Sequence, residues 1–232
     1  MTPALVLFDI DGTLVLTGRA GMRGMNRAFE ELHGVADALR DVPIAGRTDR
    51  SIVCNAFEKM GKPVTPALIA ELRDAYCRYL PIELARDTEH PREVLPGIET
   101  ALTALAARSH VGVGLLTGNF IAGAEIKLGY FDLWRRFGFG AFGDEHLERR
   151  DLVAVATAAA RRAGLPDVAP TRVVVIGDTP LDVDCAHASG ALAIAVATGP
   201  YSVEQLTATG AEVTVPDLSQ WDDIWRQLQL DD

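Results

Sequence analysis

The sequence predicts an α/β fold, in which a parallel sheet is flanked by helices and a smaller helical domain is inserted after the first strand. Three observations support this prediction. Residues 4–8 form an apolar run that ends at a turn containing Gly12, which is typical of a buried parallel strand. A long helical section follows this run. From residue 96 onward strands alternate with helices, which is the pattern of βαβ units.

The section after the first strand contains three predicted helices. Apolar residues recur at helical spacing from Arg19 to His33. Asp49 is the predicted N-cap of a second helix, which Gly61 ends. Thr65 is the predicted N-cap of a third helix, with Pro66 at its first position. We therefore expect these helices to form a domain of their own.

A charged stretch bounded by proline, residues 86–92, is predicted to link this helical domain back to the sheet. We assign residues 18–92 to a helical cap domain, and residues 1–17 together with 93–232 to the core. In the core, Pro96 and Gly97 predict a turn. After this turn we expect a helix at 98–108, a strand at 111–116, a helix-rich stretch, a strand at 172–176, a helix at 182–189 and a strand at 191–196.

The composition restricts the class of protein. Hydrophobic residues make up 48% of the 232 residues, which is enough for a sizeable core. The net charge of −10 argues against nucleic acid as a partner, because duplex binding needs clustered Lys and Arg. The three cysteines form no CxxC pair, which indicates a reducing compartment and no structural zinc. With no signal peptide and no apolar run of membrane-spanning length, we expect a cytoplasmic protein without a membrane partner, either a monomer or a homodimer.

Polar residues that the sheet does not need follow three of the predicted strands. They are Asp9 and Asp11, then Thr117 and Asn119, then Asp178 and Asp182. Each pair alone is explained by a turn, because Asp-Gly and similar dipeptides mark turns in general. Together, however, they lie at the carboxyl edge of one sheet, where α/β folds bind ligands. Converging carboxylates repel one another unless a cation lies between them, and a site of oxygen ligands without His or Cys favours Mg²⁺.

The same segments carry a family resemblance. Residues 9–14 (DIDGTL) resemble motif I of the haloacid dehalogenase-like (HAD) hydrolase superfamily, residues 115–119 (LLTGN) its motif II and residues 176–182 (IGDTPLD) its motif IV. The helical insert after motif I and the Pro96-Gly97 turn resemble the phosphoglycolate-phosphatase-like branch with a C1 cap. The resemblance spans essentially the whole chain and implies a Rossmann-like core.

The resemblance also implies roles for individual residues. Asp9 is the expected nucleophile, which forms an aspartyl-phosphate, and Asp11 is the expected general acid and base. Thr117 and the backbone N–H groups of Gly118 and Asn119 are expected to bind the phosphoryl group.

The magnesium ligands implied by the resemblance come from the same acids. They are Asp9, the backbone carbonyl of Asp11, Asp178 and, through water or by orienting the other ligands, Asp182.

Motif III should supply a cation to the phosphoryl oxygens, but its usual Lys-Pro form is missing here. Lys127, on the predicted helix after motif II, is one candidate. Arg149, or its neighbour Arg150, is the other. In the cap, Arg47 is expected to meet a second anionic group of the substrate, unless it is only a solvated loop residue.

These expectations describe a Mg²⁺-dependent phosphatase that acts on a small phosphorylated metabolite. A phosphomutase of the β-phosphoglucomutase type shares every motif and is the alternative. A binding protein that has kept the fold and lost activity is a further alternative. Dehalogenation is disfavoured, because related dehalogenases lack the second acid of motif I, and Asp11 is present here.

Overall fold

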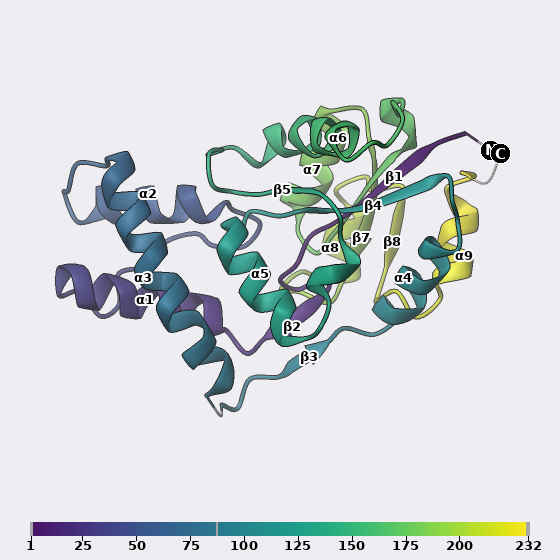
Figure 1. Ribbon diagram of the computed structural model, residues 1–232. Helices are drawn as coiled ribbons and strands as arrows, with labels where there is room; N and C mark the ends of the chain where they lie inside the picture. Colours follow the sequence, from purple (N-terminus) through teal and green to yellow (C-terminus); the bar gives the residue numbers. More distant parts are fainter. Residues whose placement is uncertain (1, 87, 231–232) are drawn as a thin grey trace.

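The computed structural model describes residues 2–86 and 88–230, and its centre is a six-stranded parallel sheet (Figure 1). The strand order is β5-β4-β1-β6-β7-β8. The strands are β1 (Ala4–Phe8), β4 (Val111–Leu116), β5 (Gly140–Ala141), β6 (Val173–Gly177), β7 (Leu192–Val196) and β8 (Val213–Val215).

Helices cover both faces of this sheet, which explains why β1 is apolar without interruption. Val6 and Phe8 belong to one buried cluster, whereas Leu5 and Leu7 belong to another on the opposite face. The first cluster is completed by α4 (Ile98–Ala106), α5 (Ile121–Tyr130) and α9 (Trp221–Gln227), and the second by α6 (Leu152–Arg162), α7 (Pro180–Ala188) and α8 (Val203–Thr207). The predicted α/β class with a parallel sheet is confirmed.

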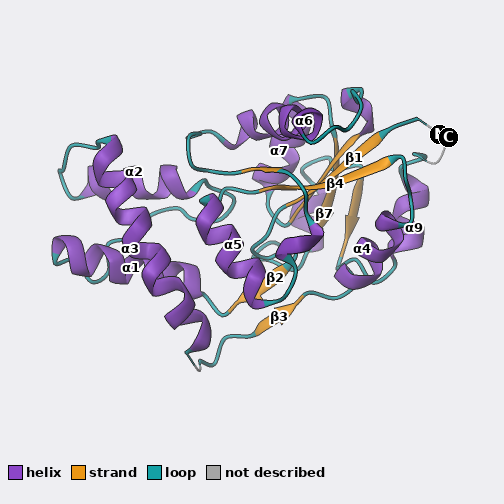
Figure 2. Ribbon diagram, viewed as in Figure 1, coloured by secondary structure: helices purple, strands orange, loops and turns teal. Residues whose placement is uncertain are grey.

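The three helices of the insert, which we call the cap helices, lie to one side of the sheet (Figure 2). They are α1 (Ala20–His33), α2 (Asp49–Lys59) and α3 (Pro66–Ala85). Their buried apolar side chains form a third cluster, to which the core contributes Phe120. The chain passes to and from the cap helices through an antiparallel pair, β2 (Val15–Thr17) and β3 (Arg92–Val94). The domain division at residues 18 and 92 stays a prediction.

One local prediction was wrong. Thr48, and not Asp49, is the N-cap of α2, because the Thr48 hydroxyl accepts a hydrogen bond from the backbone N–H of Ser51 at 3.1 Å. Asp49 is instead the first helical residue. The predicted linker, residues 86–92, includes residue 87, which lies outside the described residues, and it ends where β3 begins, at Arg92, which pairs with Thr17.

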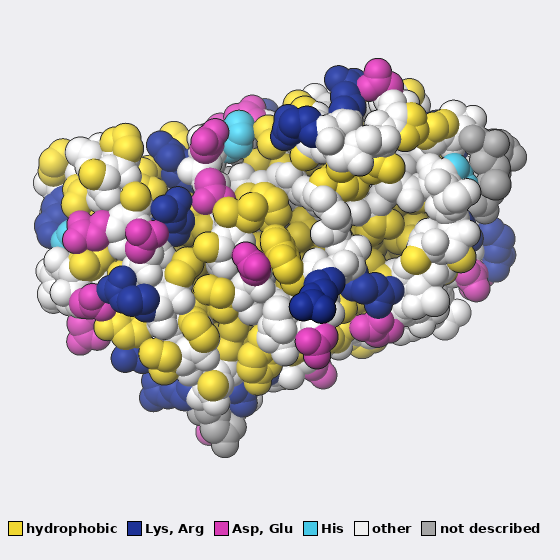
Figure 3. Space-filling model, viewed as in Figure 1, with side chains coloured by type: hydrophobic (Ala, Val, Ile, Leu, Met, Phe, Trp, Pro, Cys, Tyr) yellow, Lys and Arg dark blue, Asp and Glu magenta, His cyan; other side chains and the backbone are white. Residues whose placement is uncertain are grey.

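The surface mixes side chains of all kinds. On the face seen in Figure 3, Lys and Arg side chains alternate with Asp and Glu, and hydrophobic side chains gather over the middle, where α5 lies. The described helices include none with the length and apolar character needed to cross a bilayer.

A buried acid, Glu83, joins α3 to α1. Its carboxylate accepts hydrogen bonds from Arg23 Nε at 2.6 Å and from Arg27 Nη1 at 3.1 Å. Burial alone would raise the pKa of Glu83, but the hydrogen bonds from the two arginines outweigh burial and lower it.

Replacing Glu83 by Gln is expected to lower the free energy of unfolding by about 2 kcal/mol at neutral pH, because a hydrogen bond to a charged group contributes about 1.5–3 kcal/mol. Since the folded pKa lies below the unfolded one, this contribution is present above the unfolded pKa and disappears as the pH falls through the folded pKa. Urea unfolding of E83Q and the unmodified chain across this pH range measures the difference.

The matched control is E31Q, because Glu31 also pairs with an arginine, Arg78, but at the surface. Its effect on stability should be much smaller than that of E83Q. Equal losses in the two variants, or a loss that does not shrink at acid pH, would contradict the assignment.

Candidate active site

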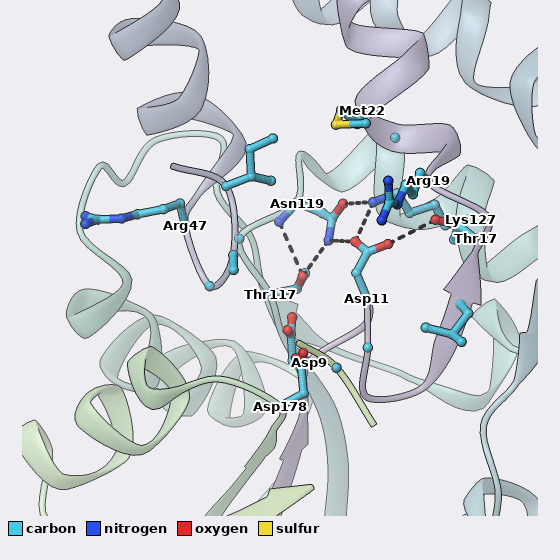
Figure 4. A pocket seen from close by; sticks show the side chains of 18 of the residues that line it. Asp9, Asp11, Thr17, Arg19, Met22, Arg47, Thr117, Asn119, Lys127 and Asp178 are labelled. Atoms are coloured by element: carbon cyan, nitrogen blue, oxygen red, sulfur yellow. Dashed lines mark hydrogen bonds and ion pairs between the residues drawn. The ribbon is translucent and has the colours of Figure 1, made fainter. Parts of the chain in front are cut away.

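The carboxyl ends of three neighbouring strands form the floor of the candidate site. Asp9 follows β1, Thr117 follows β4 and Asp178 follows β6. Because β1 pairs in parallel with both β4 and β6, these strand ends meet at one edge of the sheet. Figure 4 shows the three side chains close together, with Asp11 and Asn119 beside them.

Asp9 is buried and pairs with an arginine. Its Oδ1 lies 3.1 Å from Nη2 of Arg149. Burial raises the pKa of Asp9 to about 6, because the loss of water outweighs the positive charge of Arg149 and the nearby charge of Asp182 also favours the protonated form.

Arg149 lies in the 3₁₀ turn that precedes α6, and it is buried like its partners. The same Nη2 atom lies 2.5 Å from Oδ1 of Asp182, so that one guanidinium joins the acid after β1 to an acid in the first turn of α7. Arg150, the neighbouring candidate, is exposed and pairs instead with Asp184 at 2.5 Å. The structure therefore brings Arg149 to the predicted nucleophile and leaves Arg150 outside the site.

Lys127 is buried as well, and it pairs with the other acid of motif I. Its Nζ lies 2.5 Å from Oδ2 of Asp11 and 2.5 Å from Oδ1 of Asn119. Burial alone would raise the pKa of Asp11, but Lys127 and the hydrogen bonds from Asn119 and Thr17 outweigh burial and lower it. Lys127 and Arg149 thus hold different carboxylates and are not interchangeable.

The side chain of Thr117 is oriented by Asn119. The amide Nδ2 of Asn119 donates to Thr117 Oγ1 at 2.8 Å and to Asp11 Oδ2 at 2.9 Å. Because the Thr117 hydroxyl accepts this hydrogen bond, its own proton is left to donate to a ligand.

Three buried acids, Asp9, Asp178 and Asp182, have carboxylate oxygens within 4.8 Å of one another. Burial raises the pKa of Asp178 well above its usual range, and the charges of Asp182 and Asp9 raise it further. The backbone passes close by, since a Cβ on Gly199 would lie 1.7 Å from Oδ2 of Asp178, and one on Gly12 would lie 2.4 Å away. The carboxylate of Asp11 is not a member of this group, so its expected contribution through the backbone carbonyl stays a prediction.

Asp182 has little freedom to act as a direct ligand. Its Oδ2 accepts hydrogen bonds from the backbone N–H of Thr179 at 3.0 Å and from the Thr179 hydroxyl at 2.7 Å, which closes a capping box at the start of α7. Its other oxygen is bound by Arg149. Both carboxylate oxygens therefore already have donors, which favours the predicted indirect role.

One further residue of the site, Asp49, is not among the residues that the sequence predicts for it. Its carboxylate accepts a hydrogen bond from the backbone N–H of Phe120 at 2.9 Å, and its own N–H donates to the carbonyl of Gly118 at 2.7 Å. A Cβ on Gly118 would lie 2.2 Å from the carbonyl oxygen of Arg47, so only glycine allows this close approach. Burial raises the pKa of Asp49 to about 6. The sequence pattern at Asp49 indicates the start of a helix, and such a signal does not identify a contact with a distant loop.

A cavity of about 630 Å³ lies between the strand ends and the cap helices. Its wall includes Asp9, Asp11, Lys127 and Asp178 from the core, and Arg47 from the loop before α2. In Figure 4 the side chain of Arg47 extends away from Asp9 and Asp11. Its contact with a second anion of the substrate stays a prediction.

Solved structures share this fold, and a family profile matches the sequence. The profile of the haloacid dehalogenase-like hydrolases matches residues 6–187. CbbY from Rhodobacter sphaeroides in complex with phosphate has a similar structure (TM-score 0.71, 21% identity, 94% of this chain and 96% of that one). A predicted phosphoglycolate phosphatase from Haemophilus somnus 129pt also has a similar structure (TM-score 0.69, 19% identity, 97% of this chain and 99% of that one). No curated protein matches the chain significantly. Since the profile covers most of the sequence, the chain belongs to the haloacid dehalogenase-like hydrolase family.

Proposed function

We propose that this hydrolase removes the phosphoryl group from a small phosphorylated metabolite, with Mg²⁺ bound and through an aspartyl-phosphate on Asp9. The observation that carries the proposal is that the two acids of motif I pair with different cations. Asp9 is held by Arg149 at the strand end, whereas Asp11 is held by Lys127 beside it. Two carboxylates with different partners in one cavity suit two different roles in the reaction.

The acids beside Asp9 fit a hard cation. Carboxylate oxygens of Asp9 and Asp178 lie within 4.8 Å of each other, so that one ion could contact both. Asp178 also lies among other acids, whose negative charge a divalent ion would neutralise. Asp182 would orient this group through its contacts with Arg149 and Thr179. Bound Mg²⁺ would reduce the negative charge of the phosphoryl oxygens and so lower the barrier to attack by a carboxylate.

In the first step, a carboxylate oxygen of Asp9 forms a bond to phosphorus while the bond to the leaving alcohol breaks. Asp11 donates a proton to the departing oxygen. In the free protein Lys127 keeps Asp11 ionised, and the approach of a negatively charged phosphate raises its proton affinity. In the second step, Asp11 accepts the proton of the attacking water, phosphate leaves and the Asp9 carboxylate is restored.

The phosphoryl group needs donors on its other oxygens during both steps. The Thr117 hydroxyl can donate one hydrogen bond to these oxygens, and the backbone N–H groups of Gly118 and Asn119 are further candidate donors. Arg149 supplies positive charge beside Asp9. The phosphomutase alternative uses the same residues and differs only in whether water or a second sugar hydroxyl receives the phosphoryl group.

Replacing Asp9 by Asn is expected to lower Mg²⁺-dependent phosphate release by about 10³-fold or more, because the nucleophile is lost. A panel of phosphorylated metabolites, assayed with Mg²⁺ and with EDTA, measures this, and D184N serves as an acid-to-amide control at the surface. Turnover by D9N close to that of the unmodified chain would reject the nucleophile. Formation of a sugar-phosphate isomer without phosphate release would favour the mutase, and no metal-dependent reaction with any compound would favour a binding protein.

Binding of Mg²⁺ should also be visible without any activity. At about 100 times its Kd, Mg²⁺ is expected to stabilise the folded chain by about 2.7 kcal/mol, which thermal unfolding detects. In D178N this gain should be lost, while in EDTA D178N should unfold at the same temperature as the unmodified chain or higher, because a repelled buried charge is gone. An equal Mg²⁺ effect in D178N and D184N would contradict the assignment.

The separate roles of the two cations can be tested with two esters. A nitrophenyl phosphate has a leaving group that needs no proton, whereas an alkyl phosphate depends on the proton from Asp11. Replacing Lys127 by Met is expected to reduce kcat for the alkyl ester more than for the nitrophenyl ester. Replacing Arg149 by Lys should reduce both by a similar factor, about 10²-fold, because the contact with Asp9 is disturbed. If the ratio of kcat for the alkyl ester to kcat for the nitrophenyl ester changed equally in both variants, the separate roles of Lys127 and Arg149 would be contradicted.

A further inference from the structure

We propose that the alcohol part of the substrate carries an apolar body, which the cap side of the cavity binds. This inference rests on the proposed phosphatase function and narrows its substrate class. We expect the substrate to be an alkyl or aryl-alkyl phosphate and not the phosphate of a small polar or anionic alcohol.

The size of the cavity is the first observation. Its volume of about 630 Å³ lies in the middle of the range of about 300–1,000 Å³ that is usual for pockets of drug-sized ligands. A phosphoryl group at Asp9 with a two-carbon alcohol would leave most of this space to water. The cavity therefore fits a substrate with a larger alcohol part.

The chemistry of the wall is the second observation. On the cap side the wall is formed largely by apolar side chains, namely Met22, Met25, Leu39, Ile44 and Ile52. Met22 and Ile44 are 37% and 36% exposed although they are large and apolar. Single exposed apolar residues are common on protein surfaces. These two, however, come from different segments of the chain and line the same cavity. An apolar ligand would remove both from water.

The distribution of charge on the wall favours the same class of substrate. Lys127 and Arg149 already pair with acids of the core. The other two cations among the described wall residues, Arg19 and Arg47, are solvent-exposed, and Arg47 extends away from the strand ends (Figure 4). The buried acid Asp49 adds negative charge to this side. Apart from Arg19 and Arg47, a second anion on the substrate would meet an apolar wall and a buried carboxylate on this side.

A glycine of α1 allows two side chains of the wall to pack closely against the cap helices. A Cβ on Gly21 would lie 3.2 Å from Nζ of Lys127 and 3.5 Å from the hydroxyl of Tyr76. Both side chains line the cavity, and Tyr76 is otherwise buried. The absence of a side chain at Gly21 therefore lets Lys127 and Tyr76 reach the wall between the phosphoryl end of the cavity and its apolar end.

The test compares primary phosphate esters whose alcohols have similar acidity, so that differences in kcat/KM report contacts with the alcohol part. We expect hexyl phosphate and 2-phenylethyl phosphate to exceed ethyl phosphate by at least about tenfold in Mg²⁺-dependent kcat/KM. We expect phosphoglycolate, which carries a second anion, to be no better than ethyl phosphate. Equal or higher kcat/KM for phosphoglycolate than for the apolar esters would overturn the inference and leave the phosphatase function intact. Failure of every ester to react would overturn both.

A variant tests whether the apolar wall is responsible. Replacing Met22 by Ser should lower the ratio of kcat/KM for 2-phenylethyl phosphate to that for ethyl phosphate by about fivefold to tenfold. Ile82 on α3 is 54% exposed and lies outside the cavity wall, so I82S is the matched control and should leave the ratio unchanged. An unchanged ratio in M22S, or an equal fall in I82S, would overturn the inference.

Discussion

Repulsion between buried carboxylates is the constraint on which the rest of the site depends. The parallel register of β1, β4 and β6 gathers acids at one edge of the sheet, where they are removed from water. Such a group is stable only when cations lie between its members. Arg149 joins Asp9 to Asp182, and Lys127 holds Asp11. These contacts explain why two long cationic side chains are buried in a chain whose net charge is −10.

The same constraint connects the cap helices to the chemistry. Lys127 is buried where α5 meets α1 and α3, beside Gly21 and Tyr76. A cation in that position is removed from water by the cap helices and can compensate its desolvation only through Asp11 and Asn119. The predicted proton-transfer acid is therefore coupled to the packing of residues that are distant in the sequence.

Much of the fold and part of the site could be predicted from local sequence signals. The strand at Val111–Leu116 has the predicted bounds, and Thr65 is the predicted N-cap, because apolar runs and caps are encoded by adjacent residues. The partners of Asp9 and Asp11 could not be assigned, since Lys127 and Arg149 reach them across 116 and 140 positions of the chain and only tertiary packing decides which cation meets which acid. Asp49 was missed for the same reason. Its partners, Gly118 and Phe120, lie on another element.

The segment before and within the first turn of α2 is attached to the core at several points. Besides the contacts of Asp49, the Thr48 hydroxyl donates to the carbonyl of Leu147, and Arg50 donates to that of Asp144. Each such hydrogen bond contributes about 0.5–1.5 kcal/mol, so withdrawing this segment from the core would cost several kcal/mol. The cap is therefore attached to the core here as well as at the crossing of β2 and β3, and it cannot swing away about that crossing without breaking these hydrogen bonds.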